Sequence, residues 1–285
     1  MDYVILNNGN KMPMEGFGVY QVADPKECEQ AVYDAISLGY RLIDTAAAYM
    51  NEEAVGKAVH KAIDEGIVTR EDLFITTKLW VQDYNNAQKA IDRSLALLGL
   101  DYIDLYLFHQ PMGDYMGAYK VMEENYRSGK LKAIGVCNCY PHVLADICET
   151  VDILPAVNQI ELHPFFQQPL ALETAKEYGV ICEAWGPFAE GKHGIFSHPV
   201  LSKIGKKYDK TAAQVALRWN IDRGVIVIPK SVHYERIKQN INIWDFKLDE
   251  ADMKEIEKLD LGKSDIVNHY DPNFVKMIHS VKIHD

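Results

Sequence analysis

The sequence predicts an α/β fold, a closed (β/α)8 barrel of the TIM type that forms a single domain over residues 1–285. Two observations predict it. Short apolar or β-branched runs alternate with amphipathic stretches along most of the chain, which is typical of parallel βαβ units. Eight such units follow one another, and 285 residues suit a barrel that commonly needs about 250. No linker or shift in composition marks a domain boundary.

The expected elements follow in order along the chain. A hairpin over 3–11 comes first, because its Asn-Gly pair favours a tight turn, and it is expected to close the barrel floor. Strands are expected at the short apolar runs 16–20 (GFGVY), 41–45 (RLIDT), 73–79 (LFITTKL), 103–109 (IDLYLFH), 133–138 (AIGVCN), 156–161 (AVNQIE), 180–185 (VICEAW) and 225–230 (VIVIPK). Helices are expected at the amphipathic stretches 25–38, 52–64, 86–98, 115–128, 141–149, 169–178, 211–222 and 233–240.

A glycine-rich nucleotide fingerprint is missing after the first strand. The run GFGVYQV contains only Gly16-x-Gly18, without the third glycine of G-x-G-x-x-G. A nucleotide cofactor would therefore not be held in the Rossmann manner.

Composition excludes several classes of function. The net charge of −11 disfavours nucleic-acid binding, and no apolar run approaches the roughly 20 residues of a membrane span. The amino-terminal segment lacks a charged region followed by a long apolar one, so a cytoplasmic protein is expected. The cysteines are odd in number and scattered, which predicts buried thiols rather than disulfides; they are Cys28, Cys137, Cys139, Cys148 and Cys182. Their spacing completes no metal set, so no metal is expected.

Three predicted strands end in a polar side chain: Asp44, Lys78 and His109. Residues two apart in a strand share a face. Each polar residue therefore shares a face with apolar residues of its own strand, namely Leu42, Phe74, Leu105 and Leu107. All three positions are carboxyl ends of strands, where barrel enzymes place their chemistry.

Each of these residues alone has a simpler interpretation. A strand-end Asp often caps a turn, a lone Lys is usually solvated, a lone His is more often a core residue, and Tyr49 alone would be packing. Together they indicate more, because an inward Lys78 needs a partner and Asp44 is the nearest candidate. A cation beside Tyr49 is expected to pull its pKa below the usual value of about 10, as suits a general acid.

The sequence resembles the aldo-keto reductase superfamily, in its bacterial diketogluconate-reductase-like branch. The resemblance rests on LIDTAAAYMNEE (42–53), TTKLW (76–80), LYLFHQP (105–111), GVCNC (135–139), VNQIELHP (157–164) and IPKSVHYERIKQN (228–240). It implies a barrel enzyme that reduces aldehydes and ketones with a nicotinamide cofactor. The family's catalytic tetrad corresponds to Asp44, Tyr49, Lys78 and His109.

The resemblance also implies NADPH (NADP+) as the cofactor, favoured over NADH. Its binding residues would be Asn138, Gln159, Trp185, Gly186, Lys230, Ser231, Val232, Arg236, Gln239 and Asn240. Within this set, Asn138 and Gln159 would bind the carboxamide, and Trp185 would stack on the nicotinamide. A cation, a hydroxyl and a guanidinium near one helix start suit a 2′-phosphate; they are Lys230, Ser231 and Arg236. Gln239 and Asn240 would contact the adenine. Cys137 replaces the family's Ser, and a thiol is a weaker hydrogen-bond partner.

The substrate is less well defined by the sequence. Tyr20, Trp80, His109 and Gln110, with Trp185, would line the pocket, and the loops after 110 and over 186–199 would shape the rest. Gln110 stands where several relatives carry Trp, so a more polar pocket is expected. Small aldehydes, α-keto compounds and oxidised sugar acids all remain open as substrates, and a monomer is the family default.

Two other interpretations compete with a reductase. One is a barrel that binds NADPH as a regulatory or structural module with little turnover, against which the complete tetrad argues. The other is an unrelated barrel enzyme such as a phosphate-sugar isomerase, which would want a glycine-rich phosphate loop late in the chain. GPFAEGKHG (186–194) matches such a loop only faintly.

Overall fold

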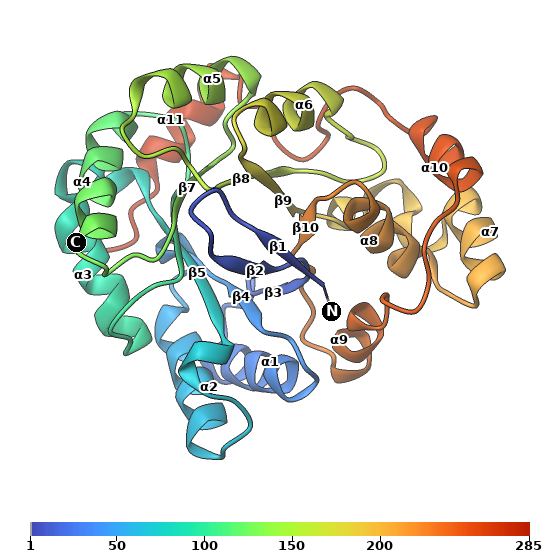
Figure 1. Ribbon diagram of the computed structural model, residues 1–285, viewed down its shortest axis with the longest axis horizontal. Helices are drawn as coiled ribbons and strands as arrows, with labels where there is room; N and C mark the ends of the chain where they lie inside the picture. Colours follow the sequence, from blue (N-terminus) through green and yellow to red (C-terminus); the bar gives the residue numbers. More distant parts are fainter. Residues whose placement is uncertain (1) are drawn as a thin grey trace.

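The protein is an eight-stranded parallel barrel surrounded by helices (Figure 1). The computed structural model describes residues 2–285. The strands are β3 (Gly16–Gly18), β4 (Leu42–Asp44), β5 (Phe74–Leu79), β6 (Leu105–Phe108), β7 (Ile134–Cys137), β8 (Val157–Glu161), β9 (Ile181–Trp185) and β10 (Ile226–Val227). They pair in chain order from β3 to β10, and every pair is parallel. All eight predicted strands are present, and the predicted fold class is confirmed.

The barrel closes where β3 meets the last strand. The Gly18 amide donates to the Pro229 carbonyl at 3.1 Å, and Glu15 forms a parallel bridge with Val227. A Cβ on Gly18 would lie 2.9 Å from the carbonyl oxygen of Ile228. The GFG run therefore serves close backbone packing at the seam, because only glycine fits there.

Eight helices match predicted ones. They are α1 (Pro25–Ser37), α2 (Glu52–Asp64), α3 (Ala87–Leu98), α4 (Tyr115–Arg127), α5 (Pro141–Thr150), α6 (Pro169–Glu177), α8 (Ala212–Asp222) and α9 (Tyr234–Ile241). Several start at recognisable signals; α8 begins with a capping box between Thr211 and Gln214. Short 3-10 segments link other elements: η1 (Ala47–Tyr49), η2 (Arg70–Asp72), η3 (Val81–Asn86) and η4 (Ala189–Ser197).

Three helices were not predicted: α7 (Pro199–Tyr208), α10 (Glu250–Glu257) and α11 (Pro272–Ser280). They lie outside the simple strand–helix alternation, and the search for that alternation passed over them. Local signals were present, since α7 and α11 each begin with a proline and Asp249 forms a capping box with Asp252.

The face assignment from strand parity is confirmed. The inward set forms one buried cluster, which contains Leu42, Phe74, Leu105 and Leu107. The alternate set packs against the helices in a second cluster, which contains Ile43, Ile75 and Leu79. The inward cluster also includes Leu6 and Met12, which belong to the amino-terminal hairpin.

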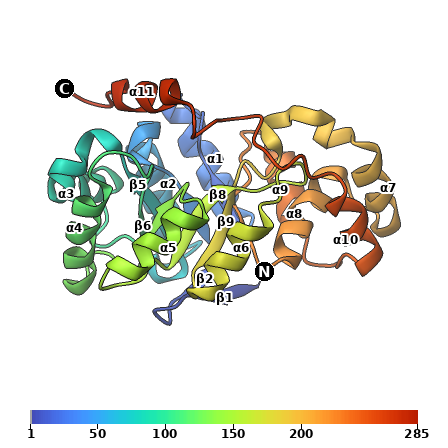
Figure 2. The same cartoon turned by 90° about the horizontal axis from the view of Figure 1, so that it is seen from above.

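The hairpin closes the barrel floor, as predicted. Its strands are β1 (Tyr3–Ile5) and β2 (Lys11–Pro13), so it extends two residues beyond the predicted end. Figure 2 shows the hairpin at one end of the barrel and α11 at the opposite end. The carboxyl ends of the strands therefore open away from the floor. None of the helices described over residues 2–285 is long and apolar enough to cross a membrane.

Candidate active site

Side chains from consecutive strands meet at the carboxyl end of the barrel. Asp44 ends β4 and Lys78 lies near the end of β5, while Tyr49 lies in η1 directly after β4. Lys78 Nζ donates to Asp44 Oδ1 at 2.6 Å and lies 3.3 Å from Tyr49 Oη. It also donates to the Thr45 carbonyl at 2.9 Å. The structure thus brings together three of the four residues expected for catalysis.

Lys78 is fully buried, so its charge depends on these partners. Burial lowers the pKa of Lys78, but the Asp44 carboxylate, together with the Tyr49 and Cys137 side chains, outweighs burial and raises it. The ammonium therefore stays charged, and it donates its three hydrogens to three oxygen atoms.

The expected depression of the Tyr49 pKa is wrong. Burial raises the pKa of Tyr49 above its usual value, and Lys78 only partly opposes this. The physical reason is that the charge of Lys78 is already neutralised by Asp44, whose own negative charge also raises the pKa. The phenol therefore keeps its proton at neutral pH.

His109, the fourth expected residue, follows β6 and faces Tyr49. Its ring centroid lies 5.6 Å from that of Tyr49 and 5.2 Å from that of Trp80, both edge-on. Burial, together with the nearby Lys78 cation, holds the pKa of His109 well below its usual range. Its Nδ1 is buried without a hydrogen-bond partner among residues 2–285. The neutral ring can donate one hydrogen bond without adding charge.

The residues expected to bind a nicotinamide lie beside this group. Trp185 Nε1 donates to Asn138 Oδ1 at 2.8 Å, and Asn138 Nδ2 donates to the His109 carbonyl at 3.1 Å. Asn138 has a left-handed backbone (φ 57°), and Gly186 follows Trp185 with φ 59°. Gln159 Nε2 donates to Asp44 Oδ2 at 2.8 Å, a contact that the sequence did not predict.

A second group lies after β10, at the start of α9. Lys230, Arg236 and Gln239 are exposed, whereas Ser231 and Asn240 are buried and Val232 is half-buried. Ser231 Oγ accepts from the His233 amide at 3.1 Å. Within residues 2–285, neither Lys230 nor Arg236 is paired with a carboxylate. Two such cationic side chains beside the start of a helix are suited to binding a phosphate group.

Among the residues expected to line a substrate pocket, Tyr20 and His109 contact the Tyr49 ring, and Trp80 contacts His109. Tyr20 is 53% exposed, and its ring centroid lies 5.0 Å from that of Tyr49. Trp80 is buried, and its Nε1 donates to the Val281 carbonyl in the carboxyl-terminal tail. Gln110 is also buried, and its Oε1 lies 3.2 Å from His269 Nε2.

Sequence reasoning missed the contributions of the carboxyl-terminal segment. His269 reaches Gln110, and the tail contacts Trp80 through Val281. The tail is fixed further by a hydrogen bond from Gln82 Nε2 to the His284 carbonyl. No local sequence pattern predicts these contacts, because they join residues more than 150 positions apart.

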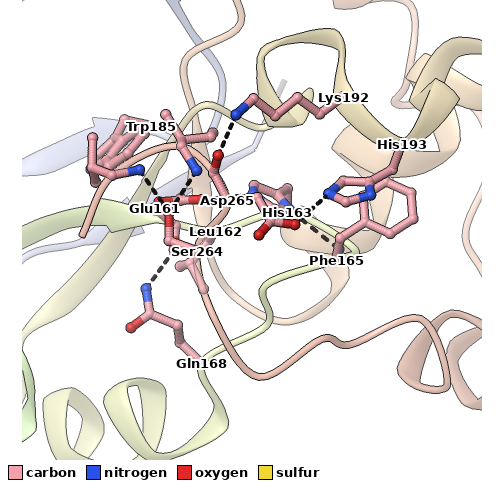
Figure 3. Close-up of polar contacts among 12 residues, drawn as sticks. Glu161, Leu162, His163, Phe165, Gln168, Trp185, Lys192, His193, Ser264 and Asp265 are labelled. Atoms are coloured by element: carbon pink, nitrogen blue, oxygen red, sulfur yellow. Dashed lines mark hydrogen bonds and ion pairs between the residues drawn. The ribbon is translucent and has the colours of Figure 1, made fainter.

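A polar network near Trp185 joins β8 and the loop that follows β9 to the segment after α10 (Figure 3). Ser264 Oγ donates to the buried Glu161 carboxylate at 2.6 Å. Lys192 donates to the Asp265 carbonyl, and His193 Nε2 lies 3.2 Å from Asp265 Oδ2. The loop expected over 186–199 is therefore tied to the segment that follows α10.

A parallel barrel that holds a phenol beside a buried lysine at the carboxyl ends of its strands is the framework of a proton-donating barrel enzyme. The sequence model of the Aldo/keto reductase family matches residues 14–261. The chain belongs to the aldo/keto reductase family, and it is an oxidoreductase that acts on carbonyl groups.

Individual relatives agree with this assignment. Methylglyoxal reductase DkgA of Escherichia coli (strain K12) is 46% identical over 261 residues, which cover 90% of this chain and 93% of that protein. Glyoxal reductase of Bacillus subtilis (strain 168) is 43% identical over 261 residues, covering 90% and 92%. The crystal structure of an aldo-keto reductase from Bombyx mori in complex with NADP superposes with a TM-score of 0.87 at 36% identity, covering 92% and 94%. The resemblance to the bacterial DkgA-like branch is thereby confirmed.

Proposed function

We propose that this protein, acting as one barrel domain over residues 1–285, reduces small aldehydes and ketones with NADPH, and that α-oxoaldehydes such as methylglyoxal and glyoxal are its substrates. The contact of Lys78 Nζ with both Asp44 and Tyr49 carries the proposal, because it holds a phenol ready to donate a proton. The reductase names of the two bacterial relatives support the substrate class. They give no support to a purely regulatory barrel.

The cofactor residues fit NADPH by their chemistry. When bound, NADPH supplies the hydride that the carbonyl carbon receives. Asn138 and Gln159 would bind its carboxamide, and Trp185 and Gly186 would contact the nicotinamide. Lys230, Ser231, Val232 and Arg236 hold the 2′-phosphate end, where the two cations have no competing carboxylate. Gln239 and Asn240 contact the adenine.

Tyr49 delivers the proton to the carbonyl oxygen. Its high pKa keeps the proton in place until the oxygen gains negative charge. Lys78 then stabilises the phenolate that forms, because Nζ lies 3.3 Å from Oη. Neutral His109 donates a hydrogen bond to the same oxygen and orients it.

The pocket residues suit a substrate with a second oxygen. Gln110 Oε1 can only accept, so His269 donates to it through Nε2. The amide nitrogen of Gln110 stays free to donate to the neighbouring oxygen of an α-oxoaldehyde. Tyr20 and Trp80 enclose the remaining apolar part. Oxidised sugar acids remain the alternative substrate class, for which the same amide would bind a hydroxyl.

We also propose that the protein is a cytoplasmic monomer. The five cysteines are free and buried, as is usual in a reducing compartment. Gel filtration at two protein concentrations would reveal an oligomer by a concentration-dependent elution volume.

The test compares wild type with Tyr49→Phe. NADPH absorbance is followed with methylglyoxal, and NADPH affinity is measured by tryptophan quenching. We expect the variant to lose at least about 100-fold in turnover, the size of a general-acid contribution, with nearly unchanged affinity. Tyr33→Phe is the matched control, since its hydroxyl bonds Glu65 on the surface. Equal turnover in Tyr49→Phe would contradict the assigned role.

A further inference from the structure

Gln159 holds its side-chain amide between two carboxyl groups. Its Nε2 donates to Asp44 Oδ2 at 2.8 Å and to Glu183 Oε2 at 2.7 Å. All three side chains are buried. An amide nitrogen has two hydrogens, so both are used, and only the amide oxygen of Gln159 is left for another partner.

Glu183 lies on β9, opposite Gln159 in the register of β8 and β9. Its second oxygen, Oε1, is buried without a hydrogen-bond partner among residues 2–285. An ionised carboxylate with an unpartnered oxygen would be costly there, and Asp44 adds repulsion through the shared amide. A neutral carboxyl group removes the repulsion and lowers the cost of burying the unpartnered oxygen.

The groups around Glu183 agree with a neutral carboxyl. On its neighbouring strands, β8 contributes Gln159 and β10 contributes Ile226. The titratable groups that act on it across the barrel are Asp44 and Lys78, together with the Cys137 thiol. Burial and then Asp44 raise the pKa of Glu183 to about 8, against the opposing effects of Gln159 and Lys78.

We propose that Glu183 is a positioning residue whose protonated carboxyl fixes the amide of Gln159, so that the amide oxygen faces the carboxamide of the cofactor. The inference rests on the proposed function, because it assigns Gln159 to the nicotinamide. A neutral Glu183 also leaves Asp44 as the one carboxylate that neutralises Lys78. Ionisation of Glu183 would place a second negative charge beside that pair and oppose phenolate formation on Tyr49.

Two variants separate shape from charge. Glu183→Gln keeps an acceptor for Gln159 and cannot ionise, whereas Glu183→Leu removes both the acceptor and the ionisable group. Glu123→Gln is the matched control, because Glu123 is also a buried carboxyl but bonds the Ile153 amide, away from this group.

The first readout is NADPH affinity from tryptophan quenching. We expect Glu183→Leu to bind NADPH about tenfold more weakly, the effect of one misplaced hydrogen bond. Glu183→Gln and Glu123→Gln should stay within about threefold of wild type on the same scale. Unchanged affinity in Glu183→Leu would overturn the positioning role.

The second readout is urea unfolding of the cofactor-free protein. The folded state holds the Glu183 proton up to about pH 8, whereas the ordinary pKa of a glutamate is 4.5. Stability from this group therefore falls as the pH rises between those values, because the folded state binds more protons there. The unfolding midpoint of Glu183→Gln should rise relative to wild type across that range. Glu15, whose burial raises its pKa to about 8 as well, contributes equally to both proteins.

The third readout is the pH profile of kcat/KM. In wild type, kcat/KM should fall above about pH 8. In Glu183→Gln, this fall should be absent. If the urea difference does not depend on pH, Glu183 is not the neutral group inferred here. Absence of NADPH binding by wild type would instead overturn the proposed function, and the urea comparison, which needs no cofactor, would still decide the state of Glu183.

Discussion

At the scale of single residues, the active end of the barrel is one continuous hydrogen-bond chain. It runs from Glu183 through Gln159 to Asp44, and from there through Lys78 to Tyr49. Each member is held by its neighbour, so a change at one position moves the others. The sequence supplied Asp44, Lys78 and Tyr49 as one group, because each lies at or directly after a strand end.

The buried ion pair of Lys78 and Asp44 gives a prediction on stability. Lys78→Met should lower the free energy of unfolding by about 3–5 kcal/mol, because it leaves a buried carboxylate without its cation. Urea unfolding measures the loss. Adding Asp44→Asn to the variant should recover part of the stability, since the unpaired charge is then gone.

An exposed ion pair provides the matched control. Lys254 and Glu250 form a pair on α10 in which both side chains are mostly exposed. Lys254→Met should change the free energy of unfolding by less than about 1 kcal/mol. A loss as large as that of Lys78→Met would show that burial is not what makes the Lys78 pair costly to break.

At the scale of elements, α9 and the segment before it bring together the cations proposed for the 2′-phosphate. Lys230 follows β10, and Arg236 lies in the first turn of α9. A helix start adds partial positive charge from its free amides. This local arrangement follows from the sequence IPKSVHYERIKQN, which explains why it could be predicted without the structure.

Arg236→Ala should therefore weaken NADPH binding more than NADH binding. A hydrogen bond to a charged group contributes about 1.5–3 kcal/mol, so NADPH affinity should fall by roughly 10-fold or more. Tryptophan quenching with each nucleotide measures both affinities. Lys238→Ala, an exposed cation on the same helix, is the control and should affect the two nucleotides alike. An equal loss of NADPH and NADH in Arg236→Ala would place the 2′-phosphate elsewhere.

The late elements show where prediction from sequence failed. Helix α7 is inserted before α8, whereas α10 and α11 follow the last strand–helix unit, and the segment between α10 and α11 reaches back over the barrel. Ser264 bonds Glu161 and His269 bonds Gln110, so this segment helps to build the rim of the active site. Such contacts depend on how the chain folds back, which local periodicity does not encode.

At the scale of the whole molecule, the barrel needs both a seam and a floor. Gly18 closes the seam against the last strand. The hairpin closes the floor, where Leu6 and Met12 join the inward cluster of the strands. The floor lies at the end opposite the carboxyl ends that carry the chemistry (Figure 2), so the packing of the floor is spatially separate from the active site.

This separation predicts that a floor mutation changes stability without changing the chemistry. Met12 is fully buried, so Met12→Ala should cost about 2–5 kcal/mol in the free energy of unfolding. Activity per folded molecule at a temperature well below the transition should stay near that of wild type. Ile5→Ala, at a 56% exposed hairpin position, is the control and should cost much less. A large fall in kcat for Met12→Ala would show that the floor is coupled to the site.

The sequence by itself determined the eight strands, eight of the helices, the inward face of each active strand and the group of Asp44, Tyr49, Lys78 and His109. These follow from periodicities of two and 3.6 residues, which are local properties of the chain. The tertiary structure alone decided the proton affinity of Tyr49, the place of Glu183 beside Gln159, and the reach of His269 to Gln110. Those depend on burial and on contacts between residues distant in sequence, because desolvation and hydrogen bonding act through space and not along the chain.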